Sequence, residues 1–80
     1  MKRTYVQVIC NHLDNGAVIP MEIHWDDGRM WKIKRVIHTS VSPDGEYEGI
    51  RYAILINRST RFLYQLGDRW YVETIEQEGA

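Results

Sequence analysis

The chain has 80 residues, of which 44% are hydrophobic and 11% aromatic, so it has the length of one small domain and enough apolar residues to build a core. Ten Lys and Arg residues against eleven Asp and Glu residues give a net charge of −1, which excludes nucleic-acid binding driven by bulk positive charge. The single cysteine, Cys10, excludes an internal disulfide framework and a cysteine-rich zinc site.

The sequence indicates β-structure along its whole length. Short runs of Val, Ile, Thr, Tyr, Phe and Trp alternate with Gly or Pro, and no segment has a sustained helical period. In chain order, we predict strands over residues 4–12, 17–25, 29–42, 46–57, 61–66 and 70–75. Residues 1–75 are predicted to form one domain, and the polar tail 76–80 is expected to fray.

The turn after residue 25 predicts the register of its hairpin. A three-residue loop over residues 26–28 sets Ile23 opposite Trp31 and Glu22 opposite Lys32, so that apolar residues meet on one face and opposite charges on the other. A two-residue loop would mix the two faces, because side chains alternate along a strand. We therefore predict the longer loop, with its glycine at positive φ.

The later turns are predicted as three-residue loops at 43–45, 58–60 and 67–69. These loops pair Val41 with Tyr47, Ile56 with Phe62 and Leu66 with Trp70. Keeping Trp31 inside then requires a bulge near Arg35, which bends the long strand 29–42. The predicted core comprises Ile19, Met21, Ile23, Trp31, Ile33, Val36, Tyr52, Ile54, Ile56, Phe62, Tyr64, Leu66, Trp70 and Val72. Together these features predict an all-β fold, a single antiparallel, partly open barrel of five to six strands, SH3-like or related.

Two sequence patterns carry a resemblance. They are Pro20-x-x-Ile23-x-Trp25-x-Asp27-Gly28-Arg29 in the first hairpin and Arg69-Trp70-Tyr71-Val72 in the last strand. The chain resembles small bacterial domains of unknown function that have a P-x-x-I-x-W-x-D-G-R hairpin and a terminal R-W-Y/F-V strand, over residues 19–73. The resemblance implies a small β-barrel and no established activity.

Aromatic and apolar positions predicted to face outward favour an interaction module without enzymatic activity. Ala53 and Leu55 fall on the outer face beside Leu63, and residues 5–9 are apolar on both faces, as in an edge strand that pairs across a homodimer. The partner would be a protein or a second copy of the chain. The predicted partner-binding residues are Trp25, Arg29, Arg51, Leu55, Leu63 and Tyr71.

A second interpretation is a barrel that binds nucleic acid. Outward arginines interleaved with an aromatic residue can follow a phosphate backbone and stack a base. The residues concerned are Lys32, Lys34, Arg51, Arg61, Arg69 and Tyr71. The opposing interpretation is an ordinary solvated exterior, in which Glu22 offsets Lys32.

A third interpretation, a small enzyme or metal protein, would depend on Cys10, His12 and His38. Cys10 and His12 share a strand face, but the second ligand pair of a structural zinc site is missing. No spacing unites a nucleophile with a base, and no phosphate-binding loop is present. We predict no catalytic, cofactor or metal site. Without a signal peptide or a long apolar run, we expect a cytoplasmic protein that does not enter a membrane.

Overall fold

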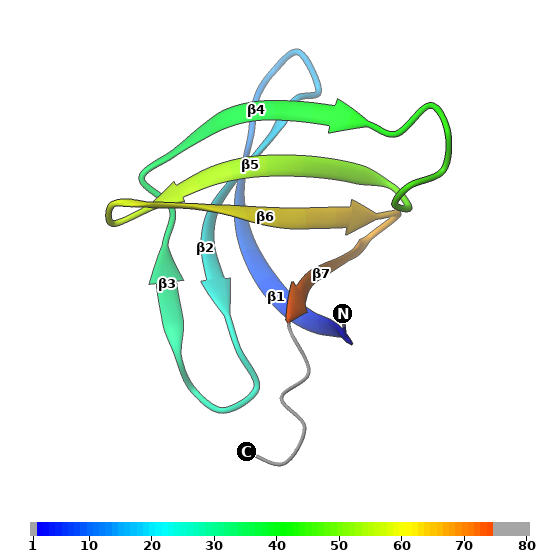
Figure 1. Cartoon of the computed structure of the whole chain (residues 1–80). Coiled ribbons are helices and arrows are strands. Elements are labelled where there is room, and N and C mark those ends of the chain that lie inside the picture. Colours follow the sequence, from blue (N-terminus) through cyan, green and yellow to red (C-terminus); the bar gives the residue numbers. More distant parts are fainter. Residues whose placement is uncertain (1, 75–80) are drawn as a thin grey trace.

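The structure, a computed structural model, describes residues 2–74 and contains one curled antiparallel sheet of seven strands. In chain order the strands are β1 (Lys2–His12), β2 (Val18–His24), β3 (Met30–Lys32), β4 (Arg35–Val41), β5 (Ile50–Ile56), β6 (Ser59–Leu66) and β7 (Arg69–Thr74). Their spatial order is β3-β2-β1-β7-β6-β5-β4, and the sheet forms a half-barrel in which β4, β5 and β6 cross over β1 and β2 (Figure 1). The all-β antiparallel prediction is confirmed. The tail expected to fray, 76–80, lies outside the described residues.

The strand predicted over residues 29–42 is two strands, which is why the expected five to six strands become seven. Between β3 and β4, the Ile33 N–H donates to the Met21 carbonyl at 2.9 Å and the Lys34 N–H donates to the Leu55 carbonyl at 2.7 Å. The chain therefore exchanges a partner in β2 for a partner in β5 within two residues. The bulge expected near Arg35 lies at Ile37 instead, where the β4–β5 register shifts.

β1 is a central strand, and the prediction of an edge strand over residues 5–9 is wrong. Residues 2–6 of β1 pair with β7, and residues 7–12 pair with β2, with a register shift between Ile9 and Cys10. Val6 lies in the core and Val8 packs against it, whereas Tyr5 and Ile9 are exposed on the outer face of the strand. The outermost strands of the sheet are β3 and β4.

The register of the first hairpin is confirmed. Glu22 pairs with Lys32 and Ile23 pairs with Trp31, and Gly28 closes the three-residue loop at φ 92°. Asp27 supports this loop, because its carboxylate accepts the Arg29 N–H at 3.0 Å. That bond is the main reason why the pKa of Asp27 lies below its usual range.

The registers predicted for the β5–β6 and β6–β7 hairpins are wrong, the first by three residues and the second by one. Ile56 pairs with Ser59 and not with Phe62, and Leu66 pairs with Arg69 and not with Trp70. Both loops contain two residues, and their first residues, Asn57 and Gly67, have φ angles of 55° and 62°. A shift by an odd number of residues exchanges the two faces of a strand, because side chains alternate along it. Leu63, predicted outside, is therefore fully buried opposite Tyr52, and Phe62, predicted in the core, is 48% exposed.

The three-residue hairpin loop predicted at residues 43–45 is also wrong, although a turn lies there, in which the Gly45 N–H donates to the Ser42 carbonyl at 3.5 Å and Gly45 has φ 78°. β4 and β5 are joined by a longer connection over residues 42–49, and Val41 pairs with Ile50 and not with Tyr47. The connection folds onto the outer face of the sheet, where the Tyr71 hydroxyl donates to the Glu48 carbonyl at 3.1 Å. Gly49 ends the connection against the backbone of Gln65.

The core lies on the inner face of the half-barrel. It comprises Val6, Ile23, Ile33, Tyr52, Ile54, Ile56, Leu63, Trp70 and Val72. Apart from Phe62, the main error in the predicted core is Met21, which is exposed. The β1–β2 register skips Met21, so that Pro20 occupies the inward position instead. Trp31 and Val36 pack against the core but are only half-buried.

Gly49→Ala is expected to destabilise the fold by more than about 2 kcal/mol, because a non-glycine residue at φ 80° is strained and its Cβ would collide with the Gln65 carbonyl. Gly16→Ala is the matched control, since Gly16 has φ 87° but nothing within 4 Å of an added Cβ. Urea unfolding of both variants measures the difference. Equal losses would show that the close approach of Gly49 does not matter.

The corrected register predicts opposite results for two neighbouring residues. Leu63→Ala should cost about 2–5 kcal/mol, because it leaves a cavity in the core. Phe62→Ala should cost under about 1.5 kcal/mol, because the ring is half-exposed. Thermal and urea unfolding of both variants check the register, and the reverse ranking would restore the three-residue loop.

Candidate functional site

β6 and β7 separate partway along their length. They pair at Leu66 with Arg69 and at Tyr64 with Tyr71, but the ladder does not continue beyond this pair. β6 stays paired with β5 back to Ser59, and β7 stays paired with β1 up to its last residue. The two strands therefore diverge from a shared turn (Figure 1).

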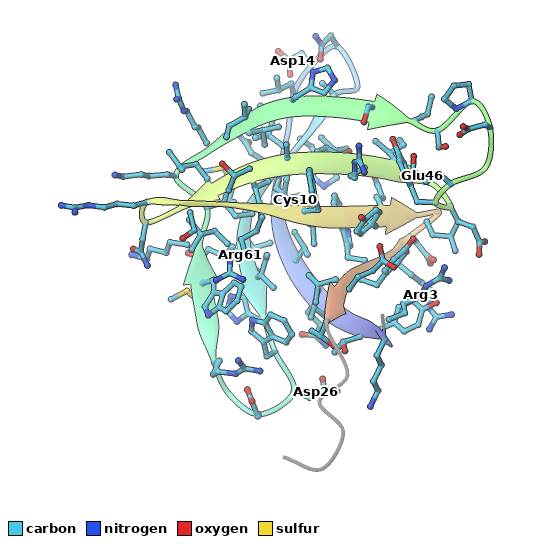
Figure 2. The ribbon with its side chains drawn as sticks, in the orientation of Figure 1. Arg3, Cys10, Asp14, Asp26, Glu46 and Arg61 are labelled. Atoms are coloured by element: carbon cyan, nitrogen blue, oxygen red, sulfur yellow. The ribbon has the colours of Figure 1, made fainter. Side chains whose placement is uncertain are left out.

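A cleft of about 240 Å³ lies between the diverging strands. Its walls come from β6 and β7, and its floor consists of two indole rings from the β2–β3 hairpin. Arg61 extends from β6 toward β3 (Figure 2). The residues of this β6–β7 cleft are Trp25, Trp31, Thr60, Arg61, Phe62, Tyr64, Val72, Glu73 and Thr74.

The walls of the cleft include unpaired strand edges. In a hairpin with a two-residue loop, the two residues that flank the loop are hydrogen-bonded to each other. Along each strand, the N–H and C=O groups of successive residues then point alternately toward the partner strand and away from it. Leu63 therefore points its N–H and C=O at β5, whereas Phe62 points them at the cleft. By the same alternation on β7, the backbone of Glu73 faces the cleft, and the structure contains no pairing between Phe62 and Glu73.

The floor of the cleft consists of two indole rings in contact. Trp25 and Trp31 meet edge-to-face, with ring centroids 5.1 Å apart. The Arg29 guanidinium lies 4.5 Å from the Trp25 centroid and is fixed by the Asp27 carboxylate at 2.8 Å. The Arg61 guanidinium lies 5.5 Å from the Trp31 centroid. Each indole thus has a guanidinium over one of its faces, and that face is not free to stack a flat ring.

A row of aromatic side chains closes the outer face above the cleft. Tyr64 and Tyr71 stack with ring centroids 4.8 Å apart and an interplanar angle of 6°. Tyr5 continues the row on β1, where it meets Tyr71 edge-on at 5.8 Å. The Arg3 guanidinium lies 4.2 Å from the Tyr71 centroid, and Arg69 lies 3.8 Å from that of Tyr5. Arginine stacking of this kind holds the row together.

The residues predicted to bind a protein partner do not form one surface. Trp25 lies in the cleft, and Arg29 covers it. Arg51 is half-buried between the rings of Tyr47 and Phe62, and Leu55 is half-buried on the outer face of β5.

The predicted exposure of Leu63 and Tyr71 is wrong. Leu63 is fully buried in the core, and Tyr71 lies beneath Arg3 and the connection 42–49 with 1% of its surface exposed. A partner cannot reach Leu63 without opening the sheet, or Tyr71 without displacing Arg3 and the connection 42–49.

The residues predicted to bind nucleic acid are likewise scattered. Arg61 lies in the cleft, Lys32 lies on β3, and Lys34 lies in the β3–β4 link. Arg69 stacks on Tyr5 near the β6–β7 turn. The structure therefore places no continuous basic track along them. Sequence reasoning missed Thr60, Phe62, Glu73 and Thr74, because the register error hid the divergence of β6 and β7.

The third interpretation gains no site from the geometry. Within residues 2–74, no three His, Cys, Asp or Glu side chains gather closely enough to hold a metal ion. His12 and His38 are exposed on different strands, and Cys10 is half-buried, where desolvation raises the pKa of its thiol. In the same part of the chain, no helix is long and apolar enough to cross a membrane.

The chain was compared with family models, with curated proteins and with solved structures, and none of them matches it. The resemblance to small bacterial barrel domains and the SH3-like classification therefore stay predictions.

The tyrosine row predicts how stability depends on pH. Burial raises the pKa of Tyr64 and Tyr71 above the usual 10.0, and also that of Tyr52. Above pH 10 the unfolded chain therefore loses protons that the folded chain retains, and the free energy of unfolding should fall as pH rises. Urea unfolding across this range measures the decline. Tyr71→Phe should make the decline shallower, and an unchanged slope would show that Tyr71 does not contribute to it.

Proposed function

We propose that the protein is a non-enzymatic interaction module that binds an extended segment of a partner protein by strand addition in the β6–β7 cleft. The observation that carries this proposal is the open backbone edge at Phe62 beside a floor of two indoles. Strand addition requires an unpaired edge for main-chain hydrogen bonds and a pocket for alternate side chains, and the cleft has both.

The opposing edge makes the cleft selective for an extended backbone. Phe62 presents an N–H and a C=O on one wall, and Glu73 presents the same groups on the other. An extended segment that pairs with either edge turns every second side chain toward Trp31 and Val72. Those side chains gain apolar burial, while the main chain satisfies groups that are otherwise left to water.

Nucleic acid is the less favoured occupant of the cleft. Bases gain affinity by stacking on aromatic faces, and Arg29 and Arg61 lie over the faces of the two indoles. The cleft also contains the carboxylate of Glu73, and the whole chain has a net charge of −1. Both features disfavour a phosphate backbone.

A library of random decapeptides displayed on phage is the probe for this function. Peptides enriched by the full chain should bind it in solution and shift its tryptophan fluorescence, since two of its three tryptophans line the cleft. Phe62→Ala should weaken the selected peptides at least about tenfold. Ile37→Ala is the matched control, because Ile37 is also 48% exposed but does not line the cleft.

Hydrogen exchange distinguishes strand addition from other modes of binding. The Phe62 amide, which faces the cleft, should exchange quickly in the free protein and slowly with peptide bound. The Leu63 amide, which faces β5, should be protected in both states. Peptide binding that leaves the Phe62 amide unprotected would contradict strand addition.

Three other results would overturn the proposal. The first is the absence of any peptide enriched by the full chain. The second is enrichment only by a variant that ends at Thr74, which would identify the chain's own last residues as the occupant. The third is salt-sensitive binding of mixed-sequence oligonucleotides that Arg61→Ala abolishes, which would assign the cleft to nucleic acid.

A further inference from the structure

We infer that the segment bound in the cleft carries an acidic side chain two residues from an apolar one, and that Arg61 recognises the acidic group. This inference rests on the proposed function and specifies the partner that it requires. Arg61 lines the cleft from β6, and Glu73 lines it from β7. The cleft therefore contains one basic and one acidic group on opposite walls.

Arg61 differs from Arg29, the other arginine that covers an indole of the floor, and shares with Arg51 and Arg69 the lack of an ion pair within the described residues. Arg29 covers Trp25 and is ion-paired with Asp27 at 2.8 Å, and Arg3 covers Tyr71 and is ion-paired with Glu48 at 3.2 Å. Arg61 covers Trp31, but in the described part of the chain no carboxylate lies within ion-pairing distance of it.

A guanidinium that stacks on an aromatic ring keeps its N–H donors in the plane of the group. Arg61 can therefore remain over Trp31 and still donate two parallel hydrogen bonds to a carboxylate. Carboxylates match this donor geometry better than backbone carbonyls do. An acidic side chain on the bound segment is thus the group that Arg61 is suited to hold.

The alternation of β-strands determines where that side chain lies along the segment. Arg61 and Val72 are on the inner face of the sheet with Trp31, whereas Phe62 and Glu73 are on its outer face. Inward-facing side chains of the segment recur every second residue, about 6.6 Å apart. One of them contacts the indoles and the next reaches Arg61, while the residue between them faces outward on the side of Glu73.

The partner segment therefore contains three consecutive residues with a fixed pattern. The first is apolar, the second is basic or polar, and the third is acidic, and the pattern can be read in either chain direction. The basic or polar residue is favoured at the middle position because it lies on the side of the Glu73 carboxylate. The acidic residue at the end of the pattern is the feature that distinguishes this cleft from a purely apolar groove.

Selecting the decapeptide library in parallel on the wild type and on Arg61→Glu tests the inference. Wild-type peptides should carry Asp or Glu two residues from an apolar residue, and those selected on Arg61→Glu should carry Lys or Arg there. Arg61→Glu should weaken the wild-type peptides at least about tenfold. Replacing the peptide's acidic residue by Lys should restore binding to that variant.

Arg58→Glu is the matched control, because it makes the same change of charge in the β5–β6 loop, outside the cleft. Equal weakening by both substitutions would overturn the inference, since it would show a general effect of charge. Enriched peptides without an acidic residue would overturn it as well. In both cases protection of the Phe62 amide would still support strand addition, so failure of the inference can be distinguished from failure of the proposed function.

Discussion

The stacked pair Tyr64–Tyr71 is the last pair that joins β6 to β7, and the two halves of the sheet depend on it. On one side of this pair, β6 follows β5, and on the other side β7 follows β1. Beyond this pair each strand keeps only its other neighbour, so β6 and β7 diverge. The connection 42–49 covers the pair from outside through the Glu48 carbonyl. The aromatic row thus closes the outer face at the point where the cleft begins.

The first hairpin was predictable because only one register satisfies both of its faces. Ile23 opposite Trp31 and Glu22 opposite Lys32 fit a three-residue loop, and Gly28 supplies the positive φ that this loop needs. The β5–β6 hairpin was not predictable in this way, because its two faces are almost equally apolar. The deciding feature is the positive φ of Asn57, which permits a two-residue loop. Asparagine adopts positive φ more readily than most residues but does not require it, so its presence in the sequence does not predict this loop.

The loop at Asn57 also limited how much of the site could be predicted, because it sets the register of β6, which forms one wall of the cleft. Trp25 and Arg29 were identified from their residue types, and the structure brings both to the floor of the cleft. Arg61 was named for a predicted outward position, whereas the structure places it on the inner face of β6, where it lines the cleft. The predicted register placed Leu63 and Phe62 on the wrong faces. Leu63, which lies in the core, was predicted to bind a partner, and Phe62, which lines the cleft, was predicted to lie in the core. The cleft itself has no local sequence signal, because it arises where two strands follow different neighbours.

The divergence of β6 and β7 has a cost that the fold alone does not explain. If the ladder continued two residues beyond Tyr64 and Tyr71, Phe62 and Glu73 would form its next hydrogen-bonded pair. Instead, Trp25 and Trp31 pack beneath the separation and line it together with Val72. Two large aromatic side chains thus lie under unpaired strand edges, and an unpaired edge is a template for pairing with another chain. Departures of this kind concentrate at functional sites, and a binding role for the cleft gives this one a physical reason.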